Sequence, residues 1–365
     1  MATLTPRIDN LEAGRNLIIN GNFPFWQRTT SLSLSASSQF AADRFSAFKA
    51  AVWTGTSTYS QDSTLVPTFA QSGYPSTYSL KITNGTGASP GATDTYILRY
   101  IIEGYDYASI HGKPVRLQFW VRSSVTGSFP ISFRNNAADR YYVATYTINS
   151  VNTWEKKTID LTLDTLGTWL FDNGGGLAIQ WVLGAGSSVQ TSSPNTWVGP
   201  TAIGFTGMTQ WAATTAATFN IAQVALIPGD FTNTSAEIPF RRAGKTISEE
   251  LGMCQRYYYD PGFESSALNH TWGSGLCTSG TTLLVNISFP VSMRSTPTAE
   301  FATSMAVLNN AGTRIALIAG PTIESVGPLG GRFNASVASG LFAGDATLLQ
   351  RNNSLVSKFS FSAEL

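Results

Sequence analysis

Apolar and polar residues alternate along many short stretches of this chain, and this period of two constrains the fold more than any other feature. In residues 115–122 the odd positions hold Val, Leu, Phe and Val, whereas the even positions hold Arg, Gln, Trp and Arg. Such alternation is typical of a strand with one buried face. Similar stretches, separated by Gly, Asn, Ser and Pro, follow one another along nearly the whole chain, which indicates a sandwich or barrel. The predicted fold class is therefore all-β.

The strand pattern predicts two domains joined by a linker. Nine strand candidates lie between residues 78 and 227, and their density indicates an N-terminal jelly-roll β-sandwich over residues 16–228. Residues 229–256 are expected to form a linker with one short helix, and residues 257–365 a C-terminal β-sandwich domain. Residues 1–15 are polar and lack a helix cap, so they are predicted to be a segment that becomes ordered on a partner protein.

The helix in the linker is predicted from Thr246 and Glu249, whose spacing fits a capping box. An apolar stripe then follows at helical spacing, made of Ile247, Leu251, Cys254 and Tyr258. Over about two heptads such a stripe is long enough to form the seam of a short trimeric coil. It can also pack against its own domain, and the sequence leaves both interpretations open.

The low charge of the chain excludes several classes of partner. Charged residues make up 12% of the sequence and the net charge is +1, whereas phosphate recognition needs a clear basic excess. Nucleic acid is therefore not expected as a ligand. No apolar run is long enough for a membrane span, and residues 1–15 lack the apolar centre of a secretory signal, so synthesis in a cytoplasm is expected. Cys254 and Cys277 are expected to be reduced thiols, with a disulfide as the alternative.

No motif of catalytic or metal chemistry stands out. His111 and His270 are isolated, and neither has the spacing of a zinc site. Two pairs of carboxylates are candidates for the catalytic pair of a glycosidase. Residues 160 and 164 bracket the end of a predicted strand, where a turn explains them better. Residues 249 and 250 begin the helix, where their negative charge interacts favourably with the helix dipole. The sequence therefore predicts no catalytic residue, no cofactor and no metal ligand.

Tryptophan is the main candidate for ligand contact, because aromatic faces stack on the C–H groups of sugars. Eight of the nine tryptophans precede Pro228. Trp120 shares its predicted strand face with polar residues, although it could also pack under a loop or against a subunit. Three other tryptophans lie in loops rich in small polar residues, where they contact a ligand or plug the end of a sandwich. The predicted carbohydrate-binding residues are Gln118, Trp120, Arg122, Trp169, Asn173, Trp197 and Trp211.

Several stretches along the chain, taken together and in order, resemble virion proteins of tailed bacteriophages. They are NLIINGNFPFWQR at 16–28, ADRF at 42–45, QVALIPGD at 223–230, IPFRR at 238–242, EELGMCQRYYY at 249–259, FPVSMRSTPT at 289–298 and FSAEL at 361–365. The resemblance implies a tail-fibre or capsid-fibre protein on the virion surface, usually a homotrimer, with a jelly roll similar to carbohydrate-binding modules. Its implied partners are other virion proteins, reached through residues 1–15, and host-surface glycan.

The resemblance leaves the role on the particle open. A non-enzymatic receptor-binding fibre is the leading expectation; a capsid decoration or head-fibre protein and a glycan-degrading tail protein are the alternatives. In the jelly rolls that the first domain resembles, the concave face binds sugar, which implies a sugar contact at the polar face of residues 118–122. Those jelly rolls commonly hold calcium through acidic residues at two places that Pro24 and Ala222 occupy in this sequence, so calcium is not expected.

Overall fold

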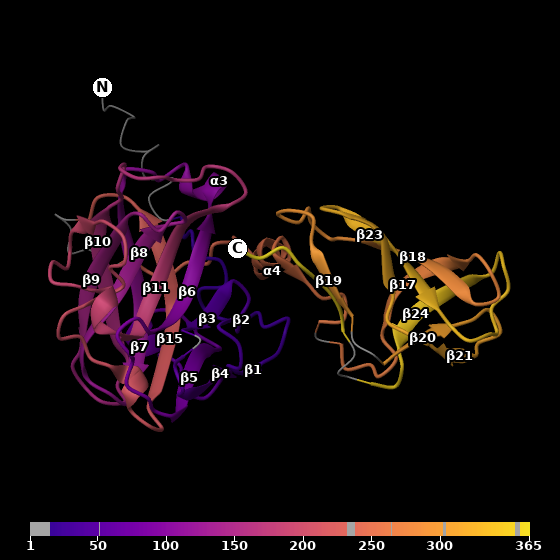
Figure 1. Cartoon of the computed structure of the whole chain (residues 1–365), viewed down its shortest axis with the longest axis horizontal. Helices are drawn as coiled ribbons and strands as arrows, with labels where there is room; N and C mark the ends of the chain where they lie inside the picture. Colours follow the sequence, from indigo (N-terminus) through magenta and orange to yellow (C-terminus); the bar gives the residue numbers. More distant parts are fainter. Residues whose placement is uncertain (1–14, 51, 232–237, 264, 302–303, 355–357) are drawn as a thin grey trace. The chain divides into compact units, whose positions relative to one another are not determined.

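The computed structural model describes residues 15–50, 52–231, 238–263, 265–301, 304–354 and 358–365. It divides the chain into two compact units, one that reaches to Glu250 and one from Leu251 to Glu364 (Figure 1). Both units are built almost entirely of β-strands. The predicted all-β class, with a jelly-roll sandwich followed by a second sandwich, is confirmed. The predicted docking segment, residues 1–15, lies outside the described residues except for Arg15.

Two antiparallel sheets form the first unit. Sheet A has the order β1 (Ser31–Ser33), β4 (Thr56–Asp62), β5 (Ser79–Thr86), β15 (Thr218–Pro228), β7 (Pro114–Ser123) and β10 (Glu155–Thr162). Sheet B has the order β13 (Trp197–Val198), β9 (Tyr141–Ile148), β8 (Gly127–Asn135), β11 (Gly175–Ala185), β6 (Thr95–Glu103), β3 (Phe45–Lys49) and β2 (Ser38–Phe40). Smaller elements connect them: α2 (Phe69–Ser72), α3 (Gly104–Tyr107), the 3₁₀ turns η1 (Ser187–Val189) and η2 (Trp211–Ala213), and a parallel pair, β12 (Gln190–Thr191) with β14 (Gly204–Phe205).

The core of the first unit lies between the two sheets. Trp181 of β11 is fully buried, and its ring centroid lies 5.7 Å from that of Phe119 of β7 and 6.3 Å from that of Phe45 of β3. Leu117 and Val121 flank Phe119 on the same face of β7 and are equally inaccessible. The alternation in residues 115–122 therefore directs alternate side chains into this core, as predicted.

Residues 16–22 fix the edge of this core through side-chain amides. The Asn16 amide donates to the carbonyls of Val224 (3.2 Å) and Arg241 (3.0 Å), and its oxygen accepts from the backbone N–H of Leu226 (3.1 Å). Gly21 approaches the same strand so closely that a Cβ would lie 2.1 Å from the Val224 carbonyl oxygen. The asparagines and glycine of residues 16–22 therefore have a structural role.

The segment that follows β15 was predicted to be a linker, but its described part packs on the first unit. Phe240 is buried, with its ring 4.8 Å from that of Tyr74. Glu250 is buried as well; its carboxylate accepts from the backbone N–H of Asn20 at 3.0 Å and lies 3.5 Å from the Arg242 guanidinium. Burial of this ring and this ion pair explains why the first unit extends to Glu250 rather than ending near residue 228.

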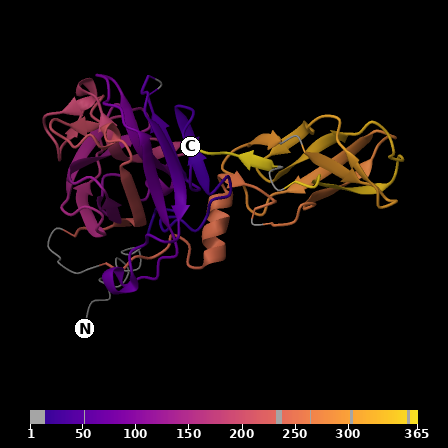
Figure 2. The same cartoon turned by 90° about the horizontal axis from the view of Figure 1, so that it is seen from below.

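The helix α4 (Ile247–Gln255), drawn as a coiled ribbon in Figure 2, begins as the sequence predicts. The Glu249 backbone N–H donates to the Thr246 hydroxyl (3.2 Å), and the Thr246 N–H donates to the Glu249 carboxylate (2.9 Å), which completes the capping box. Among the described residues, no helix is both long and apolar enough to span a bilayer.

The structure corrects the prediction that four residues, Ile247, Leu251, Cys254 and Tyr258, form the seam of a helical coil. The helix ends at Gln255, and Tyr258 lies in β16 (Tyr258–Tyr259), which pairs with β25 (Phe359–Ser362). Cys254 and Tyr258 are each only 1% exposed, Leu251 is half-buried, and Ile247 is 44% exposed. Because the backbone changes from helix to strand before Tyr258, the four side chains do not form one continuous surface stripe.

The second unit contains a three-stranded and a seven-stranded antiparallel sheet. The small sheet has the order β16, β25 and β19 (Thr298–Phe301). The large one has the order β21 (Arg314–Ala316), β20 (Met305–Leu308), β24 (Ala346–Arg351), β17 (Thr271–Cys277), β18 (Thr282–Ser288), β23 (Gly330–Ser336) and β22 (Thr322–Gly327). Phe333, Phe359 and Phe361 are fully buried and centre its core. Cys254 and Cys277 are buried and are not joined in a disulfide.

Candidate functional site

The outward face of β7 carries the first group of predicted binding residues. Because the odd positions of this strand enter the core, Gln118, Trp120 and Arg122 point away from it. In the ladder Trp120 lies opposite Ala222 of β15 on one side and Lys156 of β10 on the other. The small side chain of Ala222 adds little cover, and the Trp120 indole is half-buried.

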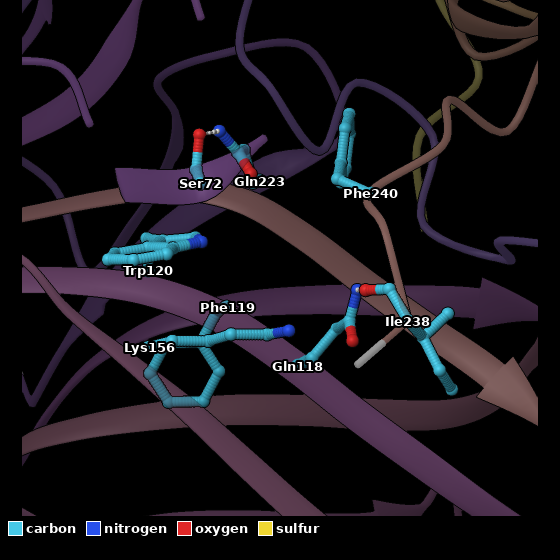
Figure 3. Close-up of a pocket in the computed structure, with 8 residues that line it drawn as sticks. All are labelled: Ser72, Gln118, Phe119, Trp120, Lys156, Gln223, Ile238 and Phe240. Carbon is cyan, nitrogen blue, oxygen red and sulfur yellow. Dashed lines mark hydrogen bonds between the residues drawn. The ribbon is translucent and has the colours of Figure 1, made fainter. Parts of the chain in front are cut away.

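A shallow pocket lies beside Trp120 (Figure 3). Its enclosed volume is about 10 Å³, which is about the room that one water molecule needs. A ligand larger than water would therefore rest across the opening, against the indole, with room for one hydroxyl group inside the pocket. The lining residues come from β7, β10, β15, α2 and the segment after β15: Ser72, Gln118, Phe119, Trp120, Lys156, Gln223, Ile238 and Phe240.

A β-bulge in β15 places Gln223 at this pocket. The register against β7 shifts between Ala222 and Ala225, and Gln223 has a φ of 51°. A bulge bends its strand and re-aims a side chain. The Gln223 amide nitrogen donates to the hydroxyls of Ser72 and Ser76, both at 2.8 Å. The bulge thus ties the loop around α2 to the rim of the pocket.

Gln118 provides an unusual polar atom in the lining. Its amide nitrogen donates to the Ile238 carbonyl at 3.1 Å, but its side-chain oxygen is buried without a hydrogen-bond partner. A buried acceptor left unsatisfied costs about 1–3 kcal/mol. A hydroxyl donor that reaches this oxygen would recover that energy, which makes Gln118 the most specific polar feature of the pocket.

The two arginines on this face of β7 differ in role. Arg116 forms two hydrogen bonds to the Asp160 carboxylate, at 2.7 and 2.8 Å, and its guanidinium lies 4.7 Å from the centre of the Phe231 ring. These contacts hold the strand edge together. Arg122 lies further along the strand, opposite Asn220 of β15, and is half-buried.

The structure separates the other predicted residues from this face. Trp211 lies in η2, fully buried, and stacks on Tyr96 with ring centroids 6.2 Å apart. Its indole is part of the core, so the prediction that it contacts a ligand is corrected: neither face of the ring reaches the surface. The Gly- and Thr-rich loop that suggested exposure instead folds this tryptophan inward.

Trp169, Asn173 and Trp197 belong to a second place in the first unit. Trp169 is 8% exposed and stacks on Tyr107 of α3, with centroids 4.8 Å apart. Trp197 is half-buried, lies 6.0 Å from Trp169, and donates its indole N–H to the Thr162 carbonyl at 2.8 Å. Asn173 is half-buried in the loop before β11. The seven predicted residues therefore occupy three locations, not one site.

Six of the eight lining residues were not predicted as site residues: Ser72, Phe119, Lys156, Gln223, Ile238 and Phe240. A signal existed for two of them, because alternation in β7 places Phe119 next to Trp120 and alternation in β10 puts Lys156 on an outward face. No local pattern could place the other four, since each reaches the pocket through a loop, the end of a helix or a bulge.

The described residues do not bring three His, Cys, Asp or Glu side chains together in the arrangement of a metal site. His111 contacts the Tyr107 hydroxyl through Nδ1 at 3.1 Å, and His270 contacts the Pro261 carbonyl through Nε2 at 2.8 Å. Both histidines thus have local structural partners.

No protein-family model matches the sequence, and no curated protein matches it. Solved structures with a similar chain trace include a putative sugar-binding protein from Bacteroides thetaiotaomicron (13% identity, 59% of this chain and 100% of that one, TM-score 0.32). Another is a family 11 carbohydrate-binding module from Clostridium thermocellum, in complex with a β-1,3-1,4-mixed-linked tetrasaccharide (11%, 53% and 97%, 0.27). A third is the enzymatically active domain of tailspike protein 4 of bacteriophage CBA120 (14%, 59% and 22%, 0.28). At these TM-scores the likenesses carry no argument about ligand or activity.

Proposed function

We propose that this chain is a non-enzymatic virion protein of a tailed bacteriophage, and that the pocket beside Trp120 contacts glycan on the host surface. The observation that carries the glycan contact is the half-buried Trp120 indole next to the unpartnered, buried oxygen of Gln118. An exposed aromatic face suits the C–H face of a sugar ring, and a buried acceptor selects a hydroxyl donor.

The remaining lining supports binding of a polar, uncharged ligand. The Lys156 and Gln223 side chains come from the strands on either side of β7, so polar groups flank the indole on both sides. Pockets for small ligands generally combine an apolar surface with a few placed polar groups. One sugar unit stacked on Trp120, with one hydroxyl directed at Gln118, satisfies both features.

The positions of the carboxylates favour glycan binding over glycan hydrolysis. Glycoside hydrolysis ordinarily uses two carboxyl groups on either side of the bond that breaks. The eight residues that line the pocket carry none. Asp160 is held by Arg116, and Asp164 by Arg140. A reducing-sugar assay on host polysaccharide is expected to show no release of ends; steady release by the purified chain would replace the binding role with an enzymatic one.

The contact with glycan is tested by replacing the indole. Trp120→Ala is expected to lower the affinity for a glycan identified on a host-polysaccharide array by roughly tenfold. A flat ligand ring stacked on an aromatic side chain, such as a nucleobase, gains about 1–3 kcal/mol, and we expect a sugar ring on this indole to gain a comparable amount. The matched control is Trp197→Ala, which removes another half-buried tryptophan from the same unit. Loss of binding in Trp197→Ala, with Trp120→Ala unchanged, would move the contact to the Trp169 cluster and contradict the proposal.

The virion role rests on the sequence stretches that resemble phage proteins, and it carries two further expectations. We propose a homotrimer, so light scattering should give three times the 39.1 kDa chain mass. Antibody labelling of intact particles should place the chain on the tail. Labelling of the head would favour the decoration role, and absence of the chain from purified particles would overturn both.

A further inference from the structure

The outward face of sheet B carries a row of polar side chains across four adjacent strands. Ser46 of β3 lies opposite Arg99 of β6, Arg99 lies opposite Gln180 of β11, and Gln180 lies opposite Ser132 of β8. Their neighbours along each strand, such as Trp181, enter the core, so these four side chains share the outer face. We call these four residues the polar row.

The polar row is held in place instead of being loosely solvated. Ser46 and Gln180 are each 2% exposed and Ser132 is fully buried, although all three point away from the core. The Ser132 hydroxyl donates to the Gln180 side-chain oxygen at 2.9 Å, and the Arg99 Nε–H donates to the Ser46 hydroxyl at 3.3 Å. Buried polar groups linked in this way form a preorganised set of donors and acceptors.

An apolar border runs along one side of the polar row. The Arg99 guanidinium lies 5.7 Å from the centre of the Phe48 ring, which extends from the next outward position of β3. Phe48 packs with Ile97, Val182 and Met208 in a small cluster outside the main core. The row therefore lies next to an aromatic and aliphatic surface, as in a site that receives a ring with both polar and apolar parts.

A second arginine lies beside the row. Arg134 follows Ser132 by two residues on β8, and its guanidinium donates to the carbonyls of Asn135 (3.1 Å) and Asn136 (3.4 Å). Burial, followed by the repulsion from Arg134, lowers the pKa of Arg99 to about 10. In the ladder Arg134 lies opposite Ala178 of β11, and Arg99 lies opposite Gln180 of the same strand. The two arginines therefore lie on the same outer face, on either side of β11. Like charges on one half-buried face cost energy unless an opposite charge is present.

Several other arginines of this unit have that opposite charge. Arg116 pairs with Asp160 and Arg140 pairs with Asp164. Among the described residues, Arg99 and Arg134 have hydrogen bonds to a hydroxyl and to carbonyls but form no ion pair with a carboxylate. Within the part of the chain that the structure describes, Arg122 of sheet A also forms no ion pair, but Arg99 and Arg134 are two such arginines on one face of sheet B. This favours a negative partner from outside the chain.

We propose that Arg99 and Arg134 bind the carboxylate of an acidic sugar residue. The planar guanidinium matches a carboxylate in two parallel hydrogen bonds. Both arginines and Phe48 are half-buried, so they can contact the sugar, and Phe48 borders its ring. Ser132 and Gln180 are buried and support the face from beneath. This site lies on the opposite sheet from the Trp120 pocket and does not depend on that pocket being a glycan contact.

The test is calorimetric titration of the full chain with trigalacturonate, and with the same trisaccharide after reduction of its carboxyl groups. Trigalacturonate is expected to bind saturably, and the reduced form at least tenfold more weakly. Sodium sulfate serves as the free-anion arm. Sulfate that binds as tightly as trigalacturonate would overturn the sugar assignment, and no binding of trigalacturonate would overturn the site.

Variants then locate the binding. Arg99→Gln and Arg134→Gln are each expected to lower trigalacturonate affinity by roughly tenfold, because each removes a charge-assisted pair. Lys113→Gln, which removes an exposed charge ahead of β7, should change it less than twofold; an equal loss in all three would reduce the effect to net charge and overturn the site. Trp120→Ala should leave trigalacturonate binding intact, which separates this site from the Trp120 pocket.

A measurement on the unmodified protein guards against variants that fail to fold. The Nε–Hε resonance of Arg99 should shift saturably with trigalacturonate in a ¹⁵N-detected titration, and should not shift with the carboxyl-reduced form. An Arg99 resonance that stays fixed while trigalacturonate binds would place the ligand elsewhere and overturn the assignment.

Discussion

The two outer faces of the first unit are covered in different ways. On sheet A, the loop around α2 and the segment after β15 pass over the strands and leave the half-buried Trp120 beside Ser72 and Phe240. On sheet B, the segment that carries β12 and β14 packs Ile203, Phe205 and Met208 against outward residues such as Ile97 and Val182. Arg99 and Arg134 remain half-buried on this face. One face thus presents an indole and the other presents two guanidinium groups.

This difference teaches that one sandwich can present two unlike chemistries. Sheet A offers an aromatic surface with amide groups, which suits a neutral sugar. Sheet B offers two half-buried arginines, which suit an acidic one. Both faces share a single core through Trp181. A substitution in this core should affect both faces, and a substitution at one surface should affect that face alone. A change of pH or salt should alter only the electrostatic interactions.

The largest loss of stability should come from a substitution in the core that the two sheets share. Trp181→Ala removes the indole that packs between Phe119 and Phe45, and a fully buried aromatic residue replaced by alanine costs about 3–5 kcal/mol. Urea unfolding followed by circular dichroism should show the transition of the first unit at lower denaturant, with binding at both faces lost. Trp120→Ala, whose indole lies outside the core, should cost less than about 1 kcal/mol. A similar cost for the two variants would contradict the shared-core description.

The next largest effect should be a loss of stability that changes binding at sheet A but not at sheet B. Phe240→Ala removes a buried ring from the edge of the Trp120 pocket, and its position outside the main core suggests a loss of about 2–3 kcal/mol, below that of a central aromatic residue. Because the segment that accepts from Gln118 passes next to this ring, glycan affinity at Trp120 should change as well. The affinity for trigalacturonate at Arg99 should stay unchanged. If titrations of the folded variant show both affinities changing together, the two faces are coupled.

Local patterns predicted the parts of this molecule that local geometry decides. The alternation in residues 115–122 placed Phe119 inward and Trp120 outward, because strand side chains point to opposite faces whatever the partner strands are. The capping box at Thr246 and Glu249 forms as expected, because its hydrogen bonds lie within one turn. The all-β class followed from the same short-range signals.

Features that depend on distant residues escaped the sequence. Trp211 was expected in an exposed loop, but that loop folds its ring into the core. Tyr258 continued the helical spacing, yet the strand pairing with β25 draws it out of the helix. Arg99 looked like any surface charge on a predicted strand, because only the register of four strands reveals that no carboxylate lies beside it.

A smaller effect concerns pH. Burial raises the pKa of Glu250 to about 6, against hydrogen bonding from Asn20 and the charge of Arg242. The folded state then binds the proton more tightly than the unfolded chain, so this group stabilises the fold below pH 4.5 and loses that contribution as the pH rises through 6. The change corresponds to about 2 kcal/mol.

The measurement is urea unfolding of the first unit between pH 4.5 and 7, with Glu250→Gln as the partner variant. The wild-type chain should lose about 2 kcal/mol of stability relative to this variant across that range. Parallel pH curves for the two proteins would show that the Glu250 carboxylate is ionised at little cost, in which case the ion pair with Arg242 is stronger than its 3.5 Å separation indicates.

The smallest effect should be that of salt, and it separates the faces without any mutation. Raising the ionic strength from about 0.05 to 0.5 M shortens the screening length severalfold. The affinity for trigalacturonate at Arg99 and Arg134 should therefore fall by a few-fold. The fall is limited to this size because half-buried charges are screened less than exposed ones. Affinity for a neutral glycan at Trp120 should stay within the error of the titration, since stacking and uncharged hydrogen bonds are little screened. Equal salt dependence at the two faces would mean that Lys156, not the indole, dominates on sheet A, and the contrast between an aromatic face and a cationic face would then have to be abandoned.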